Sequence, residues 1–333
     1  MVDFNSTEYE HMIGDLIHDT FYVERSNRGK ISGIRQFSEV LVRKILNIGS
    51  DQRLTLGNVG YMEKFKRLPK EEKEYLDVAI EKIRPLGNDG THTQYTAEFS
   101  NDELNQVKDG LFDLYAYLFI DYFLRYPMQL FTPHIILRSF SLLPPIIRYK
   151  TLKYLYNCGP NIQIANRYCL SIIKTEGKEK ALVWLTNEKD NLCEMDYPTE
   201  GEIKKYILSC PEVSPGVFEV SLDLQSYNNA YDLLYSKICD PNTSVNEKGK
   251  LYSNFEEAKE HYKKNNFLTP ANCAEARILY KKVKQSFSNN LEKVRSYYMN
   301  NNLAFPENGE ETYDEYEEFG KLMEFVYIGR ESR

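Results

Sequence analysis

The sequence IRPLGNDGTH, residues 83–92, separates two segments with helical periodicity. Pro85 disfavours helical geometry at Arg84, so we expect the preceding helix to end there. Two glycines and an Asn-Asp pair then predict a connecting loop. Arg84 can bind phosphate through two hydrogen bonds, and His92 is of the residue type that titrates nearest to neutral pH. This stretch is the strongest indication of chemistry in the chain.

A purely structural interpretation of the same residues stays open. A glycine-rich loop is an ordinary connection between helices, and an arginine near a helix C-terminus is stabilised by the helix dipole. Asn88 could orient His92 or contact phosphate, and it equally suits the backbone geometry of a turn.

The flanking segments show apolar residues at helical spacing. We expect helices over residues 8–23, 31–46, 70–83 and 101–126. Ser100 and Glu103 form a capping-box pattern at the start of the last of these helices. Residues 111–124 are strongly apolar, which predicts burial in the core or against a partner.

Four helices with an Arg-x-x-Gly-Asn-x-x-x-His pattern between the third and the fourth resemble the HEPN superfamily. Here Arg84, Gly87, Asn88 and His92 form the pattern, and the resemblance covers about residues 5–126. It implies an N-terminal helical bundle, a homodimer and metal-independent cleavage of RNA, in a branch linked to phage defence. On this interpretation Arg84, Asn88 and His92 are the catalytic residues, and no metal ion or cofactor takes part.

The chemistry of such a site follows from its residue types. Attack of a ribose 2′-hydroxyl on its own phosphodiester needs a base, an acid and positive charge on the phosphorane. A symmetric dimer would bring two copies of Arg84 and His92 into one cleft, with the apolar face of the fourth helix as the interface. Core packing is the alternative role of that face.

The sequence differs from the nuclease branches of this superfamily in two respects, and these differences favour a competing function. Pro85 follows the arginine, and the interval from Arg84 to His92 is longer than in those branches. The alternative is therefore a non-catalytic dimeric binding or regulatory module. A phosphotransferase is a third, less favoured class, because the sequence contains no phosphate-binding glycine loop of the Walker type.

The charge of the chain is unevenly distributed. The net charge is −7, yet residues 25–70 contain eleven basic and only three acidic side chains. Such a cluster favours contact with phosphate, whereas a solvated helical face is the alternative. The candidate nucleic-acid contacts are Arg35, Arg43, Lys44, Lys64, Lys66 and Arg67.

The length of 333 residues predicts two domains in a mostly α-helical protein. We expect the HEPN-like domain over residues 1–126, a proline-punctuated connector over 127–145, and a mainly helical domain of binding or sensing role over 146–333. Further helices are expected at residues 146–156, 162–174, 178–185, 202–208, 226–238, 255–264, 269–298 and 319–327, with one short strand within 217–222.

The remaining composition points to a cytoplasmic protein that does not enter a membrane. The N-terminus shows no signal-peptide pattern, and the apolar segment 111–124 is too short to span a bilayer. The six cysteines lack the paired spacing of a zinc site, so we expect reduced thiols and no metal.

Overall fold

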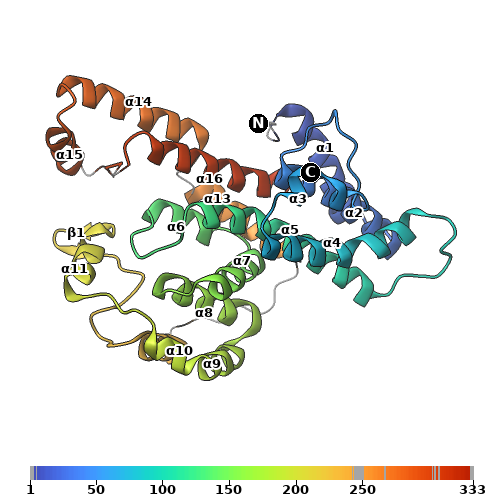
Figure 1. Ribbon diagram of the computed structural model, residues 1–333, viewed down its shortest axis with the longest axis horizontal. Coiled ribbons are helices and arrows are strands. Elements are labelled where there is room, and N and C mark those ends of the chain that lie inside the picture. The colour runs from blue at the N-terminus through green and yellow to red at the C-terminus, as the bar shows by residue number, and fades with distance from the viewer. Residues whose placement is uncertain are drawn as a thin grey trace.

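A computed structural model of the chain, shown in Figure 1, describes residues 4, 6–241, 243, 251–265, 268–301, 303, 305–306 and 308–330. The fold is mostly α-helical, as the apolar periodicity predicts. Within the described residues, strands β1 (Glu212–Ser214) and β2 (Val217–Phe218) form an antiparallel hairpin. Gly216 lies in its turn with φ 76°, a conformation that glycine adopts without strain. The sequence predicted the second strand and missed the first.

The four helices expected before residue 126 are all present. They are α1 (Thr7–Ile17), α2 (Asn27–Leu46), α4 (Lys70–Thr91) and α5 (Asn101–Arg125), with a π-helical turn at His18–Tyr22 after α1, a 3-10 turn at Val59–Tyr61 and a short α3 (Glu63–Lys66). The capping box of α5 is confirmed. The Ser100 hydroxyl accepts from the Glu103 N–H at 3.2 Å, and the Glu103 carboxylate accepts from the Ser100 N–H at 2.7 Å.

Helix α4 does not end at Arg84, and the loop expected after Pro85 is wrong. The helix continues through Pro85 to Thr91, and His92 is its C-cap. Pro85 is exposed, whereas Gly87 and Gly90 are buried. A proline inside a helix costs about 3 kcal/mol. We attribute the continuation to packing on both sides of the proline. Before it, Ile83 lies against Gly110 of α5, and after it Gly87 and Gly90 lie against α2.

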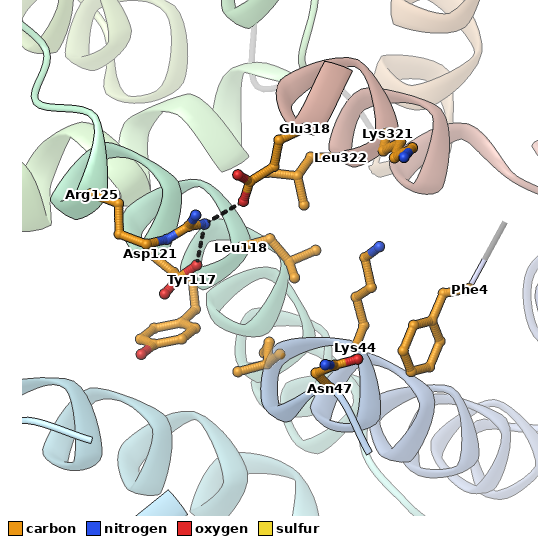
Figure 2. A pocket seen from close by; sticks show the side chains of 11 residues that line it. Phe4, Lys44, Asn47, Tyr117, Leu118, Asp121, Arg125, Glu318, Lys321 and Leu322 are labelled. Atoms are coloured by element: carbon orange, nitrogen blue, oxygen red, sulfur yellow. Dashed lines mark hydrogen bonds and ion pairs between the residues drawn. The ribbon is translucent and has the colours of Figure 1, made fainter. Parts of the chain in front are cut away.

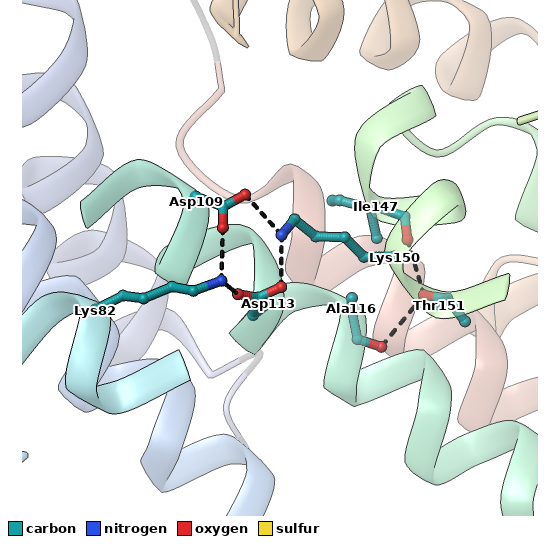
Figure 3. A network of polar contacts seen from close by, with 7 residues as sticks. All are labelled: Lys82, Asp109, Asp113, Ala116, Ile147, Lys150 and Thr151. Atoms are coloured by element: carbon teal, nitrogen blue, oxygen red, sulfur yellow. Dashed lines mark hydrogen bonds and ion pairs between the residues drawn. The ribbon is translucent and has the colours of Figure 1, made fainter. Parts of the chain in front are cut away.

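Helix α5 lies at the centre of the molecule and is buried along most of its length. Its Asp113, which interrupts an apolar run, is explained by a network of four charges (Figure 3). Lys82 of α4 lies 2.6 Å from both Asp109 and Asp113, and Lys150 lies 2.7 Å and 2.6 Å from the same two carboxylates. These ion pairs therefore connect α5 to α4 on one side and to the helix that carries Lys150 on the other.

The later helices run through the rest of the described chain. They are α6 (His134–Ser141), α7 (Pro145–Cys158), α8 (Ile162–Glu176), α9 (Lys178–Asn187), α10 (Lys189–Glu194), α11 (Glu200–Ser209), α12 (Ala230–Cys239), α13 (Leu251–Asn265), α14 (Pro270–Ser286), α15 (Leu291–Asn300) and α16 (Glu311–Tyr327). Helix α6 lies inside the expected connector.

Two expectations for the C-terminal third are wrong. The single helix over 269–298 is broken into α14 and α15, because Ser288 and Asn289 adopt positive φ angles of 50° and 62°. The acidic residues before 319 are largely helical and belong to α16. Acidic side chains in the first turn of a helix suit its dipole, which accounts for the earlier start.

Helix α16 returns to pack against α5 (Figure 1). The Phe319 ring contacts Tyr122 and Phe119, with ring centroids 4.9 and 5.8 Å apart. Beyond α16, Arg330 is buried, and its guanidinium donates to the Tyr115 hydroxyl at 3.0 Å and lies 3.9 Å from the Phe255 ring centroid. One hydrophobic core therefore joins residues from both ends of the chain.

Candidate functional site

Arg84 and His92 do not meet within one chain. Both belong to the end of α4, and eight residues of α-helix separate them by about 12 Å along the axis. The Arg84 guanidinium forms an ion pair with Glu81 at 2.7 Å, one turn earlier on the same helix. The His92 side chain is exposed to solvent. A base and a phosphate-binding cation are thus present but not assembled into one site.

The residues between them form a packing surface. A Cβ at Gly87 would come within 2.6 Å of Arg35 Cδ, and one at Gly90 within 3.1 Å of Ser32 Oγ. The two glycines therefore allow α4 to approach α2 closely. The Asn88 carbonyl accepts from the Thr91 hydroxyl at 2.9 Å and from the His92 N–H at 3.0 Å. These contacts fit the structural interpretation of the motif.

Arg28 of α2 closes the C-terminal end of α4. Its guanidinium donates to the carbonyls of Asp89 at 3.1 Å and Ala97 at 3.2 Å, and also to that of Tyr95. The same group lies over the Phe99 ring, 5.2 Å from its centroid. Because the last carbonyls of a helix lack intrahelical partners, this arginine supplies the donors that they need.

Three of the six predicted nucleic-acid contacts are engaged inside the fold. The Arg35 side chain packs against Gly87, and its guanidinium lies 3.7 Å from the Glu39 carboxylate. Arg43 donates to the Gly49 carbonyl at 2.7 Å, beyond the end of α2. Lys44 Nζ lies 5.5 Å from the Phe4 ring centroid and 5.3 Å from that of Phe325. These side chains hold α2 to its neighbours.

Lys44 also lines a cavity of about 240 Å³ between α2, α5 and α16 (Figure 2). At one side of it, Arg125 forms ion pairs with Asp121 at 2.7 Å and with Glu318 at 2.6 Å. Burial alone would lower the pKa of Arg125, but the two carboxylates outweigh it and raise the pKa. The Arg125 charge is therefore already compensated, and its role is to fix α16 on α5.

Lys64, Lys66 and Arg67 are exposed, and they share one surface segment that we call the basic segment, residues 53–70. Five basic side chains and one acidic side chain lie in it. Four buried residues anchor it to the core, and these are Leu54, Leu56, Val59 and Phe65. The Thr55 N–H donates to the Asn58 side chain at 2.8 Å and fixes the turn that follows.

Tyr61 is the residue of this segment that the sequence analysis missed. Its side chain is 79% exposed, the highest value among the exposed large hydrophobic residues of the described chain. Arg53 and Arg67 form no ion pair with any described residue, whereas Lys66 contacts Glu63 at 2.9 Å. The sequence feature that could have identified it is an aromatic residue close to Lys64, Lys66 and Arg67. It was missed because a tyrosine at that position also fits packing in the core.

The expected dimer face on α5 is covered by the chain itself. Tyr122 is fully buried, its hydroxyl donates to Glu315 of α16 at 3.2 Å, and Leu118 is 4% exposed. A homodimer, which stays a prediction, would have to use another surface.

Among the described residues, no group of three or more His, Cys, Asp and Glu side chains could hold a metal ion. Over the same residues, every helix is too short or too polar to cross a bilayer. The six cysteines are free thiols.

No family model matches the chain, and neither a curated protein nor a solved structure matches it significantly.

Proposed function

We propose that this protein binds single-stranded RNA through the basic segment. The observation that carries the proposal is Tyr61, whose exposed ring lies within a segment that is rich in exposed cations. Proteins that bind single strands combine stacking of bases on aromatic rings with cations that follow the phosphates. The buried anchors at Val59 and Phe65 hold the backbone on both sides of the ring, so less conformational entropy is lost on binding.

The placement of the cations supports the same function. Lys64, Lys66 and Arg67 are exposed around the short α3, and Arg53 is exposed near the start of the segment. Lys64 Nζ donates to the Asn47 carbonyl, which holds its side chain near the protein surface. The negative charge of the whole chain restricts any nucleic-acid contact to a local patch of this kind.

Binding without catalysis is the form of the proposal that the geometry of one chain favours. A HEPN-like bundle that cleaves RNA would need Arg84 from one chain and His92 from another, since α4 separates them. Cleavage in phage defence therefore rests on the resemblance alone, and a dimer would be required for it.

Salt dependence tests the electrostatic part. We expect the RNA affinity of the parent protein to fall steeply as salt rises, because bound phosphates release counterions. A triple variant, Lys64→Ala with Lys66→Ala and Arg67→Ala, should reduce the slope of log K against log salt by about 2, since each phosphate contact on a single strand contributes about 0.7. Lys204→Ala with Lys205→Ala, at exposed positions of α11, is the control. An unchanged slope in the triple variant would contradict the proposal.

A further inference from the structure

A group of four cations lies at the junction of α7, α8 and α12, away from the basic segment. We call it the cation cluster, and its members are Arg148, Arg167, Lys174 and Lys237. Each of the four residues is partly buried. Among the described residues, no carboxylate forms an ion pair with any of the four. Four cations without a paired anion are unusual in a half-buried position.

Arg148 and Arg167 both reach the end of α6, where they donate to the Leu143 carbonyl and the Ser141 hydroxyl, and their charges act on the two lysines. Burial and the charges of Arg148 and Arg167 lower the pKa of Lys174. Burial also lowers the pKa of Arg148 and of Arg167 to about 10. For Lys237, burial is the largest influence and Arg167 adds to it, so the pKa falls to about 8 even though Asp223 and Cys169 act in the opposite direction. Each of these shifts disfavours the charged form, so an anion bound at the cluster would relieve part of that cost.

Several donors in the cluster have neutral partners or none. Arg148 Nε donates to the Leu143 carbonyl at 2.9 Å, and Lys237 Nζ donates to the Ser221 carbonyl at 2.7 Å. Arg167 donates one N–H to the Ser141 hydroxyl at 3.1 Å, while its buried Nε has no partner. Buried donors without partners are rare in native proteins, and an unbound ligand is one explanation for them.

A second, uncharged observation points to a ligand. Gln163 is fully buried, and neither its amide oxygen nor its amide nitrogen has a partner. It lies four residues before Arg167 on α8, which places the two on the same face of the helix. Leaving such an amide without hydrogen-bond partners destabilises the folded protein. The amide would supply one donor and one acceptor beside the cations.

We propose that the cation cluster binds the phosphate group of a small molecule, with Gln163 contacting an uncharged polar part of the same ligand. Two arginine forks and two ammonium groups suit a compact group that carries two or more negative charges. Binding at the cluster is independent of RNA binding at the basic segment, so either proposal can fail without the other.

His134 lies at the edge of the cluster and supports its cationic character. Burial, followed by the charges of Arg167 and Arg138, lowers the pKa of His134, and Glu219 opposes this. The imidazole therefore stays neutral down to a lower pH than an exposed histidine would. It can then accept a hydrogen bond from a ligand hydroxyl without adding a further charge.

Thermal unfolding of the full-length protein tests the site. Inorganic phosphate, pyrophosphate and ATP without magnesium should each be compared with chloride at equal ionic strength. A ligand that binds only the folded state raises Tm. If ATP acts at lower concentration than pyrophosphate, the nucleoside is recognised as well and the ligand is a nucleotide. If pyrophosphate matches ATP, the phosphate groups alone are recognised, and either pattern supports the site.

Two variants separate specific binding from the general stabilisation that phosphate gives to proteins. Lys174 makes no hydrogen bond within the described structure, so Lys174→Met should keep the fold, raise the Tm of the unliganded protein and weaken binding by about tenfold or more. Arg167→Gln should also abolish the phosphate-dependent rise. Lys153→Met, at an exposed position of α7, should behave as the parent.

The contrary results are distinct. A phosphate-dependent rise of equal size in the parent and in Lys174→Met would overturn the proposal, as would the absence of any rise in the parent. A lower unliganded Tm in Lys174→Met would show that the lysine stabilises the fold and does not await an anion. Binding of an RNA oligonucleotide that is lost in Lys174→Met and retained in Tyr61→Ala would assign the cluster to RNA and overturn the small-molecule assignment.

Discussion

Gly87 of α4 lies directly against Arg35 of α2, so that a Cβ on the glycine would come within 2.6 Å of Arg35 Cδ and 2.8 Å of its Cβ. The second distance involves an atom next to the backbone, so a change of rotamer cannot relieve it. The residues that carry a catalytic pattern in the sequence thus set the spacing of two helices.

Substitution of Gly87 tests this packing. Gly87→Ala should lower the free energy of unfolding by about 1–3 kcal/mol, because overpacking forces α2 and α4 apart. Gly201→Ala, in α11 with no atom near the added Cβ, should be neutral or stabilising. Urea denaturation measures both. Equal stability of Gly87→Ala and the parent would show that the two helices are not in close contact there.

Arg84 and His92 provide a second test. We expect Arg84→Ala and His92→Ala to retain RNA binding, because α4 carries Arg84 about 21 Å along its axis from Lys70, the last residue of the basic segment. Both variants should be titrated with RNA and incubated with it in chelator. Loss of binding in either would contradict the assignment to the basic segment. Cyclic-phosphate products that either substitution abolishes would instead reveal a site shared between two chains.

Acidification should weaken the charge network of Figure 3. Burial alone would raise the pKa of Asp109, but hydrogen bonds from Lys150 and Lys82 outweigh it and hold the pKa below its usual value. A lowered folded-state pKa gives stability that is present above the unfolded value of about 3.9 and is lost as pH falls through the folded value. Asp109→Asn should therefore flatten the decline of unfolding free energy below about pH 5. Asp190→Asn, at an exposed position of α10, is the control and should leave the decline unchanged. An unchanged decline in Asp109→Asn as well would contradict the charge network.

A fragment of residues 1–126 tests whether the expected N-terminal domain is independent. In the full chain α16 covers Tyr122, and Arg330 donates to Tyr115, so both would lose their contacts. Burial of a large aromatic side chain is worth about 1.5–3 kcal/mol. We expect the fragment to be less stable than the full chain and to bind a hydrophobic dye. A fragment as stable as the parent, with dispersed NMR signals, would contradict this.

The sequence predicted the fold well wherever local rules decide the outcome. Helical periodicity gave α2 and α5, and the capping box at Ser100 located the start of α5 to the residue. It failed at Pro85, because the local preference for a helix end was overcome by packing that depends on Arg35 and Arg28, which are fifty or more residues away. Tertiary contacts of this kind leave no periodic pattern.

The candidate site was only partly predictable for the same reason. Charge density selected Lys64, Lys66 and Arg67, which are exposed. It could not separate them from Arg35, Arg43 and Lys44, whose side chains are engaged inside the fold. The cation cluster combines residues from three helices at irregular intervals. Its members became recognisable only once the structure showed that no carboxylate of the described residues forms an ion pair with them.

Binding of single-stranded RNA by a Tyr61→Ala variant tests the central claim most directly. Fluorescence anisotropy with a labelled mixed-sequence oligonucleotide should show that the substitution weakens the binding free energy by about 1–3 kcal/mol, which is the contribution of one stacked base. Tyr235→Ala, at a tyrosine that is 49% exposed on α12, serves as the matched control and should bind as the parent does. A parent protein that binds RNA with the same affinity as both variants would contradict the account, as would a parent that does not bind RNA.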